Sequence, residues 1–375
     1  MLYEIHMLKN YPPTNLNRDD TGAPKTCLFG GVMRGRVSSQ CLKRSWRTSP
    51  SFRAEIGDEN LGIRTRKLPV LVAEKLVEMG VTQEFADAIQ PRLTGIGNKE
   101  GKETKDGNAT AQVIFYANED IAAVAETVNA LLENCKTVKD VQKLKAKDIQ
   151  AAVTGADVRP VTLDIALFGR MVTSDAFRDV EASMQVAHAI STNKVSVESD
   201  YFTAMDDMLS GNSMNELGAA MIDDVDFNAS CYYVYASVDT DALAENLKYA
   251  ENAEEIVRKA IPALIRTMAF TDPSGKQNSF AGHVMPSVVM VECKEKKIPT
   301  SMVNAFVEPV GKGGDLVKLS AEKLAAEVDM TARNFGLEVK ERLWFCVDKY
   351  DVKPESATKI CATFPELVEA VGISL

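Results

Sequence analysis

Histidine is scarce in this chain, and its cysteines are not paired. Only three histidines occur among 375 residues, and none of the seven cysteines stands in a Cys-x-x-Cys pair. Zinc sites and disulfide scaffolds both need clustered ligands or partners, so we expect neither. The sequence therefore predicts reduced thiols, no bound metal and no cofactor.

Long apolar runs are absent as well. Apolar residues make up 45% of the chain, but polar residues interrupt each run before it reaches the length of a membrane span. Met1 to His6 lacks the charged and apolar segments of a secretion signal. These absences predict a cytoplasmic protein without membrane contact. A chain of this length can bury the core of one large domain with insertions, or of two domains.

One stretch of the chain lacks acidic residues altogether, since no Asp or Glu occurs from Thr21 to Ala54. The basic residues there are Lys25, Arg34, Arg36, Lys43, Arg44, Arg47 and Arg53. Subtracting these seven positive charges from the total of −10 leaves −17 on the rest of the chain. A solvated charged face is the simpler interpretation of such a run. A basic stretch in an acidic protein nevertheless favours a polyanion ligand, above all nucleic-acid phosphate.

The acid-free stretch contains a predicted helix over residues 39–47, for which Ser38 or Ser39 is a good N-cap. One face of this helix carries Gln40, Lys43 and Arg47, and a second stripe, suited to the core, carries Leu42 and Trp46. The start of the helix offers free backbone N–H groups and a partial positive charge, which suit a phosphate.

Two arginines precede this helix on a segment that we expect to be extended. Arg34 and Arg36 stand two residues apart, so both side chains should point the same way. Gly30 and Gly31 just before them allow a close approach of the backbone.

The apolar pattern along the chain predicts both strands and helices. Strands are predicted at 2–8, where one face should be buried, and at 161–167, 231–238, 288–293 and 343–347. Helices are predicted at 182–190, 253–270, 299–306, 321–334 and 365–371, and residues 56–160 have a helical texture. Without its insertions the chain reads β-α-β-β-α-β. We therefore predict an α+β fold on the RRM-like or ferredoxin-like plan.

Several dispersed motifs are similar to those of one family. In and before the acid-free stretch stand Asn15-Leu-Asn-Arg-Asp-Asp20, Phe29-Gly-Gly and Arg36-Val-Ser-Ser-Gln-Cys-Leu-Lys-Arg44. Further along come Asp164-Ile-Ala-Leu-Phe-Gly-Arg-Met171, Met184-Gln-Val-Ala-His-Ala-Ile190, Asp200-Tyr-Phe-Thr-Ala-Met-Asp-Asp207 and Ser301-Met-Val-Asn-Ala-Phe306. Over nearly its whole length the chain resembles the CasC backbone subunit of type I-E CRISPR Cascade complexes, a RAMP-type protein.

The resemblance implies a shape like a right hand, with an RRM-like palm, a helical fingers insertion and a thumb hairpin. The palm would comprise residues 1–55, 181–194 and 225–375, the fingers 56–180 and the thumb 195–224. Copies would stack head to tail along a CRISPR guide RNA, together with other Cascade subunits, and pre-order the guide for pairing with target DNA in antiviral defence. Base pairing would read the sequence, so the protein needs shape and phosphate contacts and no catalytic residue.

The resemblance also implies which residues contact the guide. They are Arg18 and Lys25 in the first loop, Ser38, Gln40, Lys43 and Arg47 at the helix, Met171 as an apolar wedge beside a base, and Tyr201, Phe202 and Thr203 at the thumb tip. To these we add Arg34, Arg36 and Arg44 from the acid-free stretch, and Lys276 in a glycine-containing loop, as further RNA-binding candidates.

Other interpretations stay open at this point. Asp19 and Asp20 could hold a metal ion in a RAMP-type endoribonuclease, although two-metal chemistry needs more convergent carboxylates and capping of the loop is favoured. A free-standing RNA chaperone is a third possibility. We expect His188 to be buried and hydrogen-bonded in a helix. Residues 195–224 hold seven acids and no base, so the acidic thumb, with Asp206 and Asp207, is hypothesised to contact a basic surface on the next copy.

Overall fold

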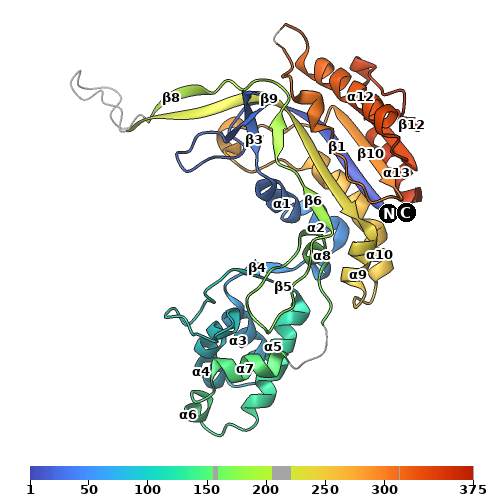
Figure 1. Ribbon diagram of the computed structural model, residues 1–375. Coiled ribbons are helices and arrows are strands. Elements are labelled where there is room, and N and C mark those ends of the chain that lie inside the picture. Colours follow the sequence, from blue (N-terminus) through green and yellow to red (C-terminus); the bar gives the residue numbers. More distant parts are fainter. Residues whose placement is uncertain (155–158, 205–220, 312, 375) are drawn as a thin grey trace, which may run out of the picture. The chain divides into compact units, whose positions relative to one another are not determined.

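The computed structural model describes residues 1–154, 159–204, 221–311 and 313–374. The chain forms two compact units (Figure 1). The first unit comprises residues 1–52, 186–237 and 261–375, and the second comprises residues 53–185 and 238–260. The chain passes between them within α2 (Pro50–Ile56), β6 (Met184–Val186), β9 (Met221–Asp239) and α10 (Ala253–Phe270). The boundaries proposed from the resemblance for palm, fingers and thumb stay predictions.

A large, mostly antiparallel sheet organises the first unit. Its strands lie in the order β12-β11-β10-β1-β9-β7-β3-β2, with β6 and β8 also paired to β9. Their bounds are β1 (Leu2–Thr14), β2 (Thr26–Phe29), β3 (Val32–Val37), β7 (Ala189–Ser191), β8 (Glu198–Ala204), β10 (Val288–Lys294), β11 (Glu341–Cys346) and β12 (Lys359–Cys361). The mixed α+β architecture predicted from the sequence is confirmed.

The helical elements of the first unit are α1 (Ser39–Arg47), the part of α10 from residue 261, α11 (Gln277–Phe280), the 3-10 turns η3 (Met302–Phe306) and η4 (Asp348–Tyr350), α12 (Leu316–Phe335) and α13 (Phe364–Ser374). Helices pack on this sheet, α12 and α11 against β1 and α13 against β11. The apolar side of α12, with Leu324 and Val328, packs with Phe306 of η3 against Met290 and Trp344 of the sheet. This contact explains the 3.6-residue apolar pattern of α12.

Strand β1 is buried on both faces, so the prediction of a half-buried strand is wrong. Glu4 and His6 alternate with apolar residues, yet both are fully buried. Glu4 pairs with Lys294, and Lys294 also contacts Glu292 at 2.9 Å. Arg342 then bonds Glu292 through Nε at 2.6 Å. Charges can be buried here because acids and bases on β1, β10 and β11 compensate one another.

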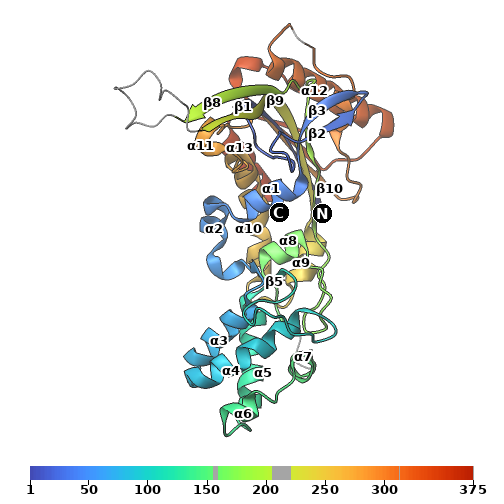
Figure 2. The same ribbon diagram turned by 90° about the vertical axis from the view of Figure 1, so that its left-hand side faces the viewer.

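The second unit is mainly helical (Figure 2). Its elements are η1 (Asp58–Asn60), β4 (Ile63–Thr65), α3 (Leu68–Glu78), α4 (Gln83–Leu93), η2 (Thr94–Gly97), β5 (Ile114–Tyr116), α5 (Asn118–Leu132), α6 (Val138–Val141), α7 (Ala146–Thr154), α8 (Leu163–Phe168) and α9 (Thr240–Leu247). The helical texture predicted from residue 56 onward is confirmed, apart from the short strands β4 and β5. Val124 and Val128, from the apolar stripe of α5, lie in one core with Leu68, Val72 and Leu76 of α3.

None of the helices in the described ranges combines the length and the apolar character needed to cross a membrane.

Two secondary-structure predictions are wrong. The strand predicted at 161–167 is the helix α8, because the Asp164 carboxylate accepts the backbone N–H of Ile165 at 3.1 Å and the hydroxyl of Thr162 at 2.8 Å. The helix predicted at 182–190 contains β6 and β7 instead. There Ile190 pairs with Arg36 on one side and Tyr233 on the other, so sheet pairing overrides the helix propensity of the alanines.

The turn between β2 and β3 needs glycine for two reasons. Gly30 and Gly31 both have a positive φ, at 59° and 76°. A Cβ on Gly30 would also lie 1.9 Å from the carbonyl oxygen of Val307, whereas one on Gly31 would meet nothing within 4 Å. The turn therefore packs closely against the chain that follows η3.

Because of this difference, alanine at Gly30 should lower the free energy of unfolding more than alanine at Gly31. Gly31→Ala should lower the free energy of unfolding by about 1 kcal/mol, through backbone strain alone. Gly30→Ala should lower it by at least about twice as much, because the backbone at Val307 must also move. Urea unfolding of both variants measures the difference. Equal losses would contradict the close approach.

Candidate nucleic-acid interface

The helix α1 has the two faces expected from its sequence. Ser38 caps it, with its hydroxyl accepting the backbone N–H of Cys41 at 3.3 Å. Leu42 and Trp46 are buried, as predicted. On the polar side Gln40 and Arg44 are exposed, and Lys43 and Arg47 are half-buried. Burial lowers the pKa of the Lys43 ammonium from its ordinary value.

The loop before β2 is tied to the start of α1. The side-chain oxygen of Asn17 accepts the backbone N–H of Ser38 at 2.9 Å, and its backbone oxygen accepts the N–H of Lys25 at 2.8 Å. The backbone oxygen of Lys25 in turn accepts the N–H of Arg36 at 2.8 Å. These bonds bring Lys25, Arg36 and Ser38 together and leave Arg18 exposed on the same loop.

His188 belongs to this group, although its sequence context gave no sign of it. It is exposed and precedes β7, so the prediction of a buried helical histidine is wrong. Its Nδ1 accepts the backbone N–H of Ser39 at 3.1 Å and lies 3.5 Å from Nη1 of Arg36. Desolvation, followed by the charges of Arg36 and Lys25, lowers the pKa of the imidazole. We call Lys25, Arg36, Ser38 and His188 the α1 cluster.

The start of α1 is less free than expected. The backbone N–H groups of Ser38, Ser39 and Cys41 donate to Asn17, His188 and Ser38, respectively. The prediction of free N–H groups for a phosphate is therefore wrong for these three. Positive charge at the start of α1 comes instead from the side chains of Lys25 and Arg36 in the α1 cluster.

Arg34 does not point to a ligand, and its assignment as an RNA-binding residue is corrected. Its side chain is fully buried. Nη1 donates to the carbonyl oxygens of Ser191 and Thr192 at 3.1 and 2.8 Å. Nη2 donates to those of Phe306 and Val307 at 2.7 and 3.1 Å. Both Nη atoms of Arg34 therefore hold β3 to two distant segments of the chain.

Lys276 lies beside the first loop. Gly275 approaches that loop so closely that a Cβ would stand 2.3 Å from the carbonyl oxygen of Leu16. Lys276 itself is half-buried and has a positive φ of 50°. The structure thus places the residue before Lys276 against the first loop, which also contains Arg18 and Lys25.

The remaining candidates lie elsewhere. Met171 belongs to the second unit and is 92% exposed, directly after Arg170, which is buried against Asp120 at 2.5 Å. Tyr201, Phe202 and Thr203 are exposed on β8, which pairs with β9 alone in a two-stranded ribbon (Figure 1). Asp206 and Asp207 lie outside the described residues.

Known proteins match the chain over nearly its full length. The model of the CT1975-like protein family matches residues 3–370. The chain belongs to this family. A chain of a structure titled "CRISPR RNA-guided surveillance complex, pre-nicking" matches with a TM-score of 0.82 and 26% identity, over 100% of both chains. A second, titled "CRISPR RNA-guided surveillance complex", matches with a TM-score of 0.72 and 24% identity, again over 100% of both, and shows the fold. No curated protein sequence matched. The resemblance to a Cascade backbone subunit is confirmed.

Asp19 and Asp20 do not form a metal site in the described part of the chain. One carboxylate oxygen of Asp19 accepts the hydroxyl and backbone N–H of Thr21 at 2.7 and 2.9 Å, and the N–H of Ala23 at 3.1 Å. These bonds, that from the Thr21 hydroxyl first, lower the pKa of Asp19. The capping role is confirmed for Asp19. Within the described ranges, no group of three His, Cys, Asp or Glu side chains is placed to hold a metal ion.

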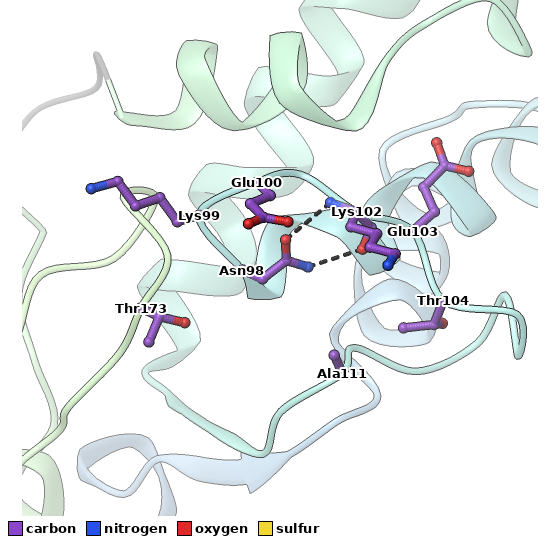
Figure 3. A pocket seen from close by; sticks show the side chains of 8 residues that line it. All are labelled: Asn98, Lys99, Glu100, Lys102, Glu103, Thr104, Ala111 and Thr173. Carbon is purple, nitrogen blue, oxygen red and sulfur yellow. Dashed lines mark hydrogen bonds between the residues drawn. The ribbon is translucent and has the colours of Figure 1, made fainter.

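The second unit contains a cavity of about 490 Å³ (Figure 3). It is lined by Asn98, Lys99, Glu100, Lys102, Glu103, Thr104, Ala111 and Thr173. The Asn98 amide bonds the backbone of Lys102 at 2.9 and 3.0 Å and so closes the loop on itself. Two lysines and two glutamates balance in charge, and the lining includes no residue predicted to bind RNA, so we assign it no ligand.

Because Arg34 binds four carbonyl groups, its removal should destabilise the fold. Arg34→Met should lower the free energy of unfolding by roughly 3 kcal/mol, because four buried carbonyl groups lose a charged donor. Arg44→Met, on the exposed face of α1, should change it by less than about 0.5 kcal/mol. Denaturant unfolding of both variants is the measurement. Equal stabilities would show that Arg34 is not structural.

Proposed function

We propose that the chain is the guide-RNA-binding backbone subunit of a type I-E Cascade complex, and that it is not an enzyme. The observation that carries this proposal is the α1 cluster. Three separated segments place Lys25, Arg36 and His188 at the start of one helix, within an otherwise acidic protein. The positive charges of Lys25 and Arg36 attract the backbone of a nucleic acid. The similarity to a surveillance-complex chain supports RNA as that nucleic acid.

The sheet of the first unit supports an RRM-like palm. The chain runs β1, α1, β7, β9, α10, β10, and the four strands lie in the order β10-β1-β9-β7. Numbered by sequence, this is the order 4-1-3-2 of a β-α-β-β-α-β fold. In this proposal the helical insertion of the second unit is the fingers, and the ribbon of β8 and β9 is the thumb.

The proposed contacts fall into two chemical classes. Cationic and polar side chains contact phosphate and ribose without reading sequence. They are Arg18, Lys25, Arg36, Ser38, Gln40, Lys43, Arg44, Arg47 and Lys276. Met171, Tyr201, Phe202 and Thr203 contact displaced bases, where apolar and aromatic faces are favourable. The guide RNA, rather than the protein, then selects the target DNA by base pairing.

Head-to-tail stacking with further copies and other Cascade subunits is part of the proposal. The ribbon of β8 and β9 exposes Glu198, Asp200, Asp223 and Asp224. We propose that this acidic ribbon contacts a basic surface of the next copy. A contact between two different surfaces repeats along a filament rather than closing into a dimer.

Sizing the RNA that co-purifies with the complex tests this function. Guide RNA of uniform length, with partner proteins, is expected. Heterogeneous RNA without partners would instead indicate an RNA chaperone. Incubation with complementary RNA and magnesium tests the endoribonuclease alternative. Cleavage at regular intervals that Asp20→Ala abolishes would overturn the non-catalytic role.

Removing two cations from α1 should change the salt dependence of binding. Lys43→Ala with Arg47→Ala should weaken binding to every RNA sequence and reduce the slope of log affinity against log salt by about 1.4. Lys75→Ala with Lys259→Ala is the control, because it removes the same charge from exposed side chains of the second unit. Fluorescence anisotropy at several salt concentrations measures both. An unchanged slope in the α1 variant would contradict the contact.

A further inference from the structure

The hydrogen bonds of His188 define where its proton lies. Its Nδ1 is approached by the backbone N–H of Ser39 at 3.1 Å and by Nη1 of Arg36 at 3.5 Å. Both groups are donors and cannot accept a hydrogen bond. Nδ1 must therefore be the unprotonated acceptor. The ring of His188 is neutral, and its proton is on Nε2.

This tautomer gives the α1 cluster a donor without a charge. His188 is exposed, and no acceptor in the described part of the chain bonds its Nε2. The charged groups that face the ring are Arg36 from β3 and Lys25 from the loop before β2. These two cations disfavour a third positive charge and attract an anionic oxygen to the same place.

We propose that Nε2–H of His188 donates a hydrogen bond to a non-bridging phosphate oxygen of the bound RNA. The inference rests on the proposed function, because it names a further contact of the same interface. This hydrogen bond differs from the lysine and arginine contacts because its donor is uncharged. A neutral donor adds affinity without releasing a counterion, so its contribution does not depend on salt.

Isosteric variants separate this contact from the structural role of the ring. The side-chain oxygen of His188→Asn can accept the Ser39 N–H in place of Nδ1, but the side chain does not reach the position of Nε2. His188→Gln places an amide N–H near that position. We expect His188→Asn to lose about tenfold in RNA affinity, the size of one hydrogen bond to a charged group. His188→Gln should retain most of the affinity.

The readouts are the affinity for a labelled single-stranded RNA, its salt slope and the melting temperature of the full chain. For His188→Asn the slope and the melting temperature should match those of the wild type. His188→Asn should weaken binding to a single-stranded DNA of the same sequence by the same factor, because RNA and DNA both carry the phosphate oxygen that accepts the bond. Loss on RNA alone would overturn the phosphate assignment in favour of the 2′-hydroxyl. A flatter slope of log affinity against log salt for His188→Asn would show that His188 contributes a positive charge, which would overturn the proposal of a neutral donor.

Two outcomes distinguish this inference from the proposed function. If the wild-type chain does not bind RNA, the proposed function fails. If the wild type binds and His188→Asn binds equally well, only the inference fails. Nitrogen NMR checks the tautomer directly. At pH 7.5 it should show a protonated Nε2, with a pKa below the ordinary value of about 6.5 that rises in Arg36→Gln.

Discussion

The buried guanidinium of Arg34 is the interaction on which the candidate interface depends. It fixes β3 to carbonyl groups at the end of β7 and at the end of η3. Within the described ranges no carboxylate pairs with it, so carbonyl dipoles compensate its charge. Because β3 leads directly into α1, a shift of this strand would move Arg36 and Ser38 together. Lys25 and Arg36, the half-buried cations of the α1 cluster, are therefore positioned by Arg34, a fully buried cation.

Elsewhere in the first unit, buried charges are compensated by ion pairs between neighbouring strands. The acids and bases on β1, β10 and β11 are buried in pairs that satisfy one another. Such a network contributes little net stability but penalises any other pairing of these strands. The network thereby specifies the register of β1, β10 and β11 in the middle of the sheet. The charges of the interface are not part of this network.

The sequence predicted those parts of the structure that depend on local chemistry. The cap at Ser38, the length of α1 and its buried stripe follow from residues within one helix. Arg34 and Arg36 could not be told apart, because both lie on the same face of β3. Segments far along the chain, at 191–192 and 306–307, cover Arg34, whereas Arg36 stays half-exposed. His188 was missed for a similar reason, since pairing of β7 with β3 and β9 decides its conformation.

The separation of Arg34 from its partners also has a consequence for biosynthesis. Its bonds span 157 residues to Ser191 and 272 to Phe306. At roughly 5–20 residues per second, a ribosome takes about 15–55 s to make the longer interval. During that time the basic hairpin of β2 and β3 has been synthesised but lacks its covering segment. The interface is thus begun early in translation and completed only when about four fifths of the chain exist, so a truncated product cannot hold it in its final geometry.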